Sequence, residues 1–271
     1  MGAVQRNHSK ASLRHSAACR FGRLRRHRLV HPRGRSWRAH ARAVQHGTRR
    51  AIRIGHCEAQ AILVAITLRD DVKFVERHYL TLDWRHAKAI LRTEYRPEWA
   101  DIMAALAEFR LLRSEVETPG GAKTAIAKRL DGFLLDRGWA KKRFETQVVV
   151  DGSSRDNPTH EIDCYRNRVA VEVEWNNKDP FFDRDLNNFR ILFELDAVAV
   201  GVIVTRSDEL QAIFDDLGRG SSYGSSTTHW SRLAPRIEGG GSGGCPVLAF
   251  GISRSLYVDE TAGVARARGK R

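Results

Sequence analysis

Asp163, Glu172 and Glu174 are the residues best placed to do chemistry. Asn167 and Arg168 lie midway between Asp163 and Glu172, and they form a two-residue turn that closes a tight hairpin. Side chains alternate along a strand, so Glu172 and Glu174 share one face, and the hairpin brings Asp163 close to them. Crowded carboxylates repel one another unless a cation lies among them. Such oxygen ligands suit Mg²⁺, which activates water and stabilises charge on a phosphate.

A solvated strand face fits the same three acids at least as well, because Asp and Glu are ordinary on exposed strands. The residues alone therefore leave both interpretations open. On either interpretation the intervening Val171, Val173 and Trp175 point the opposite way and are expected to pack in the core.

Hydrophobic periodicity predicts the elements that must position these acids. Strands are expected at 144–150, 161–166, 169–175, 198–205 and 246–251. Helices are expected at 85–91, 98–112, 123–138, 184–195 and 228–233, with another after Ser207 as its N-cap, while 59–68 fits a short strand or a short helix. The order predicts a mixed α/β sheet with helices on both faces. The segment 239–244 lacks the Lys-Ser/Thr of a phosphate-binding loop and is expected to be a flexible connector.

Positive charge is concentrated in the first 57 residues. They hold fifteen Lys or Arg and no Asp or Glu, against a net charge of +14 for the whole chain. Residues 58–271 therefore carry about −1 and would bind nucleic acid through a locally basic cleft, not a surface basic all round. We expect a disordered tail at 1–57 and a catalytic domain at 58–271. The tail fits a DNA-binding arm, an organellar transit peptide or upstream sequence read from a misplaced start.

The composition excludes several classes of protein. Four cysteines form no CxxC pair, which argues against a zinc site or a disulfide framework and fits a reducing cytosol. Apolar runs fall far short of the roughly 20 residues that span a bilayer, and no secretory signal is recognisable. We therefore expect a cytoplasmic protein without a membrane anchor.

Three segments carry a resemblance to known nucleases. The Asp-x8-Glu-x-Glu spacing across a hairpin, followed by a helix, resembles the PD-(D/E)xK nuclease core. The stretch 172–189 (EVEWNNKDPFFDRDLNNF) is similar to the BglII/BstYI group of type II restriction endonucleases, as are 223–230 (YGSSTTHW) and 239–246 (GGGSGGCP). The resemblance covers about residues 75–255 and implies a restriction-endonuclease-like mixed sheet flanked by helices.

The resemblance also implies roles for the acids. Asp163 and Glu172 match the metal-binding pair, and the Val173 carbonyl would complete the protein ligands of Mg²⁺. Glu174 falls where the wider superfamily has Lys, and a carboxylate cannot stabilise a phosphorane as an ammonium does. Its expected role is to orient or deprotonate the attacking water, with one or two metal ions. Ile162 is a second departure, because the motif usually has Pro before the Asp.

Sequence-specific contacts to DNA are expected just after the catalytic strand. Asn176 and Asn177 lie there, and Asn pairs naturally with adenine in the major groove. Adjacent Asn residues are also typical of a turn, but the resemblance implies that Asn177 reads a base. Lys178 and Arg184 are expected to touch phosphates. Further contacts are expected from the polar loop 219–228 and just beyond it, at Ser221, Ser222, Ser225, Thr227 and Arg232.

The group resembled here cuts palindromes built around GATC, with one subunit for each strand of double-stranded DNA. A two-fold site implies a two-fold protein, so we expect a homodimer, with the helices between residues 98 and 138 as its interface. The apolar stripes of these helices also fit packing within one chain. An active enzyme would need a cognate DNA methyltransferase in the host. The alternatives are a structure-directed repair nuclease on the same core and a non-cutting DNA-binding protein.

Overall fold

The computed structural model describes residues 56–118, 124–157 and 159–261, and side chains from residue 63 onwards. The chain divides into two units, Met1–Ile52 and Arg53–Arg271. Helix α1 begins at His56, so the predicted tail at 1–57 falls outside the described residues apart from its last two positions.

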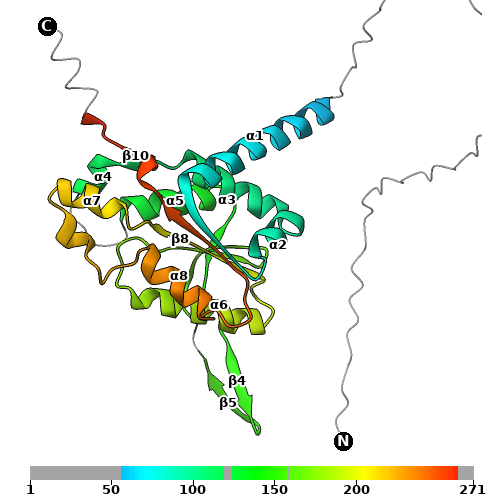
Figure 1. Ribbon diagram of the computed structural model, residues 1–271. Helices are drawn as coiled ribbons and strands as arrows, with labels where there is room; N and C mark the ends of the chain where they lie inside the picture. The colour runs from blue at the N-terminus through cyan, green and yellow to red at the C-terminus, as the bar shows by residue number, and fades with distance from the viewer. Residues whose placement is uncertain (1–55, 119–123, 158, 262–271) are drawn as a thin grey trace, which may run out of the picture. The chain divides into compact units, whose positions relative to one another are not determined.

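A six-stranded mixed sheet lies at the centre of the second unit, in the order β1-β9-β8-β7-β6-β3 (Figure 1). Its strands are β1 (Tyr79–Trp84), β3 (Ala140–Lys142), β6 (Ile162–Arg166), β7 (Val169–Val173), β8 (Val200–Arg206) and β9 (Val247–Ile252). The parallel neighbours β7, β8 and β9 are buried at every residue, as expected for strands covered on both faces. Antiparallel partners flank them on either side.

Helices cover both faces of the sheet (Figure 1). One core includes residues of α1 (His56–His78), α2 (Ala87–Thr93), α3 (Arg96–Glu108), α4 (Arg113–Glu117), α5 (Ala125–Leu135) and α7 (Leu210–Asp216). The other core contains α6 (Pro180–Glu194) and α8 (Trp230–Glu238). The predicted mixed α/β sheet flanked by helices is therefore confirmed. Short elements complete the fold: β2 (Leu111–Leu112) pairs with β10 (Tyr257–Val258), and η1 (Gly220–Tyr223) and η2 (Arg254–Leu256) are 3-10 turns.

Alternation along β7 decides which helices its acidic side chains meet. Val171 and Val173 pack in the first core, whereas Ala170 packs in the second, beside α6. Glu172 lies two residues beyond Ala170, so it points to the same face. The sheet therefore directs Glu172 towards α6.

The strand expected at 144–150 does not belong to the central sheet. Only β4 (Gln147–Val150) forms, and it pairs with β5 (Ser153–Asp156) in a hairpin that projects from the body of the fold (Figure 1). Val148, Val149 and Val150 remain 49–66% exposed. Their β-branched run favours a strand locally, but the place next to β6 is taken by β3, which was not predicted. The edge strand β1 was also missed.

Three further predictions are corrected. Ser207 is not an N-cap: α7 begins at Leu210 after Glu209, and the Ser207 side chain caps no helix. The helix expected at 98–112 spans Arg96–Glu108 instead, because Phe109 turns to an extended conformation. The segment 239–244 is a series of hydrogen-bonded turns, with Ser242 buried and its hydroxyl donating to the Cys245 carbonyl at 2.9 Å.

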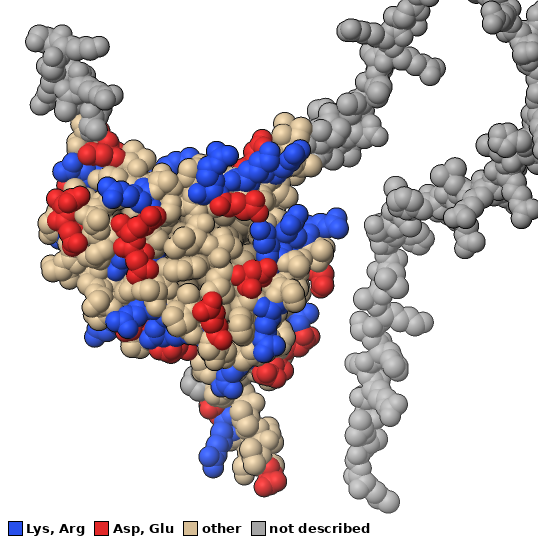
Figure 2. Space-filling model, viewed as in Figure 1, with Lys and Arg blue, Asp and Glu red and all other residues tan. Residues whose placement is uncertain are grey.

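The described surface carries both signs of charge. Figure 2 shows Lys and Arg interspersed with Asp and Glu over one face of the molecule. In the described part of the chain, no helix is long and apolar enough to cross a bilayer.

Candidate active site

The β6–β7 hairpin places Asp163 opposite Glu172. Its turn residues Asn167 and Arg168 have φ angles of 45° and 67°, the left-handed conformation that a two-residue type I′ turn requires at both positions. The strand register makes Asp163 the next partner of Glu172. The Asp163 amide donates to Glu172 Oε2 at 3.4 Å. The short turn predicted from the sequence thus brings the two acids together.

Glu172 and Glu174 are almost completely buried, with 1% and 2% of their surface exposed. Burial raises the pKa of Glu174 to about 9, and the negative charge of Asp185 adds to this shift. Burial also raises the pKa of Glu172 well above its ordinary range, with contributions from Asp185 and Asp163. A solvated strand face is therefore the wrong interpretation for the two glutamates.

Asp185 on α6 is a fourth carboxylate of this cluster, and it was not predicted from the sequence. It is 0% exposed, and burial raises its pKa. A signal was present, because the buried Phe182, Leu186 and Phe189 form the apolar stripe of α6 and Asp185 lies at helical spacing within it. An acid inside an apolar stripe predicts a buried carboxylate.

Arg184 brings positive charge to the cluster. Its Nη2 lies 3.2 Å from Glu174 Oε1 and 2.8 Å from Asp185 Oδ1. Its guanidinium also lies over the ring of Phe181, 4.1 Å from the ring centre. The side chain expected to touch a phosphate is therefore joined to two protein carboxylates, while 32% of it stays exposed.

Asn177 binds the same glutamate from the other side. Its Nδ2 donates to Glu174 Oε2 at 2.7 Å, so the side chain expected to read a base holds an acid of the cluster. Asn176 has a φ of 57°, and its side-chain oxygen is buried with no hydrogen-bond partner among the described residues. Lys178 is exposed.

The polar loop expected to contact DNA lies against this Asn-rich segment. The Thr228 amide donates to the Asn177 carbonyl at 2.8 Å, and the Thr228 hydroxyl accepts from the Asn177 amide at 3.1 Å. Lys178 and Thr227 form an isolated antiparallel bridge. Ser221, Ser222, Ser225 and Arg232 are exposed, and Arg232 Nε donates to the Ser225 carbonyl at 3.1 Å. The structure thus joins two segments that are about 50 residues apart.

Arg206, at the end of β8, holds this loop from inside and was also missed. It is 2% exposed, and its Nη2 donates to the Tyr223 carbonyl at 2.8 Å and to Thr227 Oγ1 at 3.1 Å. Burial lowers its pKa to about 10. The neighbouring sequence does not predict this burial, because an arginine at the end of a strand is ordinarily exposed.

The donor atoms of the cluster are those that Mg²⁺ prefers. Asp163, Glu172 and the Val173 carbonyl are hard oxygen ligands. Glu172 Oε1 is buried with no hydrogen-bond partner in the described chain, which is costly unless positive charge compensates it. As the side chains stand, no group of three or more His, Cys, Asp or Glu among the described residues is arranged to hold a metal ion. The chemistry of the two carboxylates and the carbonyl fits the ion.

A comparison with protein-family models identifies the chain. The model of restriction endonuclease BglII/BglIII matches residues 79–252, a range that runs from β1 to β9 and includes the whole acidic cluster. The chain belongs to this family. It is therefore a type II site-specific deoxyribonuclease whose substrate is DNA, which confirms the resemblance seen in the sequence. No curated protein matched this restriction endonuclease.

Proposed function

We propose that this restriction endonuclease makes Mg²⁺-dependent double-strand cuts at a short palindromic DNA site with a GATC core. The observation that carries the proposal is the pairing of Asp163 with Glu172 beside the buried Glu174. The buried Glu172 and Glu174, with the half-buried Asp163 beside them, are costly unless a cation compensates them, and phosphodiester hydrolysis uses such a cation.

Asp163, Glu172 and the Val173 carbonyl would hold Mg²⁺. When bound, the ion stabilises the negative charge that builds up on the phosphate. Glu174 orients or deprotonates the attacking water, and Asn177 and Arg184 hold its two oxygens. Because burial raises the pKa of Glu174 to about 9, it accepts a proton at neutral pH only when positive charge nearby lowers that pKa.

DNA recognition is assigned to the two joined segments. Asn177 reads a base with Asn176 beside it, while Lys178 and Arg184 contact phosphates. Ser221, Ser222, Ser225, Thr227 and Arg232 supply further contacts from the loop and α8. The hydrogen bonds between Asn177 and Thr228 support this assignment, because they place both segments next to Glu174.

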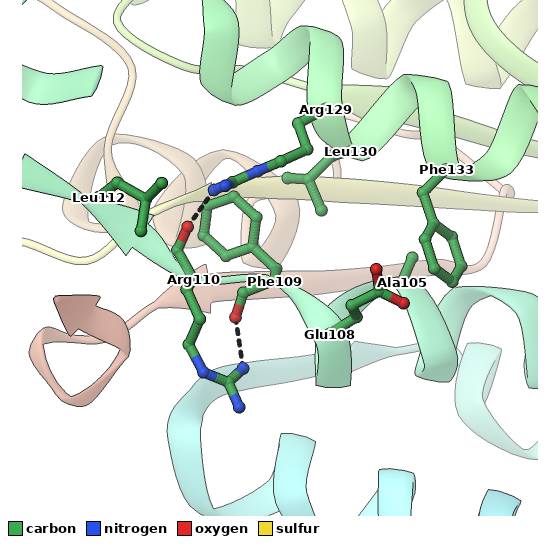
Figure 3. A pocket seen from close by; sticks show the side chains of 8 residues that line it. All are labelled: Ala105, Glu108, Phe109, Arg110, Leu112, Arg129, Leu130 and Phe133. Carbon is green, nitrogen blue, oxygen red and sulfur yellow. Dashed lines mark hydrogen bonds between the residues drawn. The ribbon is translucent and has the colours of Figure 1, made fainter. Parts of the chain in front are cut away.

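A palindromic site calls for a homodimer. We place its interface on α3 and α5, where a hollow of about 280 Å³ opens between the helices. Figure 3 shows Phe109, Leu130 and Phe133 on its wall, with Arg110 and Arg129 beside them. A partly apolar hollow of this kind suits contact with a second copy. A host of the active enzyme would also carry a DNA methyltransferase for the same site.

Plasmid digestion tests the proposal. The full chain is incubated with unmethylated plasmid in Mg²⁺ or in chelator, together with the variant Asp163→Asn. Glu161→Gln is the matched control, because Glu161 lies two residues away, is 45% exposed and faces Lys141 at 3.7 Å. We expect discrete bands from wild type and control in Mg²⁺, no bands in chelator or with Asp163→Asn, and GATC at the sequenced ends.

Other results would point elsewhere. A smear of fragments would favour a structure-directed repair nuclease, and tight binding without cleavage would favour a non-cutting DNA-binding protein. Full activity of Asp163→Asn would show that the cutting centre lies outside this cluster.

A further inference from the structure

Asp185 is an acid on a buried face of α6 where packing alone would favour an apolar side chain. It is 0% exposed on α6, and its neighbours on that face, Phe182, Leu186 and Phe189, are apolar and buried. A buried carboxylate is strongly destabilising unless it is compensated. Asp183 on the same helix is an ordinary acid by comparison, since its side chain is 60% exposed and pairs with Arg236 at 2.9 Å.

The contacts of Asp185 lead through Arg184 to Glu174. Asp185 Oδ1 accepts from Arg184 Nε at 2.9 Å and lies 2.8 Å from Arg184 Nη2. The same Nη2 donates to Glu174 Oε1 at 3.2 Å. With the ring of Phe181 beneath the guanidinium, Arg184 is fixed from three directions. Arginine's planar fork makes this kind of two-point contact well, whereas the lysine ammonium does not.

Asp185 also acts on the two glutamates directly. After burial, the negative charge of Asp185 and its side-chain hydrogen bond with Glu174 both raise the pKa of Glu174, and the same charge raises the pKa of the buried Glu172. Asp185 thus lies within the cluster and not merely beside it.

We propose that Asp185 is a positioning residue of the cutting centre: it fixes Arg184 so that the guanidinium holds Glu174 and presents positive charge to the phosphate. The proposal rests on the proposed function for its effect on cutting. The positioning itself is a property of the metal-free protein and can be measured separately.

The kinetic test uses the full-length protein and single-turnover cleavage of a DNA duplex that wild type cuts. Asp185→Asn is expected to lower the cleavage rate on the order of 10- to 100-fold, as is typical when a residue behind the reacting groups is changed. The DNA Kd, measured in chelator, should stay within about two-fold. Asp183→Asn, the same change on the exposed side of α6, should cut like wild type.

A double-mutant comparison identifies the route through Arg184. If Asp185 acts by fixing Arg184, then Asp185→Asn lowers the rate no further in the Arg184→Met background. Arg184→Lys should lose as much rate as Asp185→Asn, because it keeps the charge but not the two-point contact. Additive losses, or wild-type cutting by Asp185→Asn or Arg184→Lys, would overturn the proposal.

Thermal unfolding in chelator provides a readout independent of cutting. We expect the loss of Tm in the double variant Asp185→Asn/Arg184→Met to be smaller than the sum of the two single losses. Additive losses would overturn the positioning role even if wild type cuts no DNA. Failure of wild type to cut, with the non-additive Tm retained, would instead reject the proposed function alone. If Asp185→Asn does not fold, wild-type cutting by Arg184→Lys still overturns the proposal.

Discussion

Glu174 joins groups that are expected to serve different tasks. One oxygen accepts from Asn177, which is assigned to a base, and the other from Arg184, which is assigned to a phosphate. Burial holds this acid where its charged form is costly. A single carboxylate therefore lies between the residues proposed for base recognition and for phosphate binding, and its protonation should be visible in the stability of the protein.

The stability of the metal-free protein should fall as the pH rises. The pKa of Glu174 is raised from 4.5 to about 9 in the folded protein, so its proton stabilises the fold fully below about pH 4.5, and this stabilisation is lost as the pH rises through 9. In chelator we expect Tm to fall by at least about 3 °C between pH 6 and pH 9. Glu174→Gln should reduce the slope, Glu161→Gln should not, and saturating Mg²⁺ should reverse the fall. An equally steep slope in Glu174→Gln would contradict the assignment.

Asn177→Ala should weaken discrimination between the cognate site and a site with one altered base. Loss of a two-point contact to a base costs about 1–3 kcal/mol, or roughly 5- to 150-fold in the ratio of cleavage rates. Because Asn177 also holds Glu174, the absolute rate should fall too, so the ratio is the decisive measurement. Asn187→Ala, an exposed position on α6, is the control. An unchanged ratio in Asn177→Ala would remove the base-reading role.

At the scale of elements, two hairpins of similar length differ in position, because one belongs to the central sheet and the other does not. The β6–β7 hairpin carries Asp163 and Glu172 and lies inside the sheet. The β4–β5 hairpin pairs only within itself among the described strands, and its valines are exposed. β4 and β7 each carry three valines, so the β propensity of a strand does not decide whether it joins the sheet, and burial against other elements does.

The β4–β5 hairpin should therefore contribute little to stability. Replacing 147–156 by a short Gly-rich turn keeps the Asn157 amide near the Thr146 carbonyl, to which it donates at 2.8 Å. We expect Tm to change by less than about 2 °C. A matched pair supports the comparison: Val149→Ala should be neutral, whereas Val171→Ala, which is 2% exposed, should cost about 2 kcal/mol. A large loss of Tm on removing the hairpin would show that it packs on the body.

At the scale of the whole molecule, the proposed cut in both strands requires two cutting centres. The acidic cluster faces α6 in one core, whereas α3 and α5, which line the hollow seen in Figure 3, pack in the other core, where we propose that a second copy binds. Two copies related by a two-fold axis would match the symmetry of a palindrome.

The protein should sediment as a dimer of the 30.6 kDa chain. Glu108→Arg reverses an exposed charge at the α3–α5 hollow and should weaken the dimer by about ten-fold or more in Kd, since like charges at an interface are strongly unfavourable. Glu94→Arg, exposed at the end of α2, is the matched control. A monomer at micromolar concentration, or an unchanged Kd in Glu108→Arg, would contradict this interface.

The sequence by itself determined the acidic hairpin and the class of fold. Asn167 and Arg168 allow a two-residue turn, and strand alternation then forces Asp163, Glu172 and Glu174 together. These are short-range constraints, so reading a few neighbouring residues is enough to find them. The family resemblance began in the same stretch and extended to residues 223–230 and 239–246, and the match over residues 79–252 confirmed it.

Only the tertiary structure decided what surrounds those acids. The pairing of Arg184 with Glu174, the burial of Asp185 and the hold of Arg206 on the 223–227 loop each depend on how α6 and the loop pack against the sheet. The same packing left the 147–150 strand outside the sheet and gave its expected place to β3. Contacts between distant segments form because those segments bury surface together. The sequence next to Asp185 or Arg206 therefore does not predict which residues these two side chains contact.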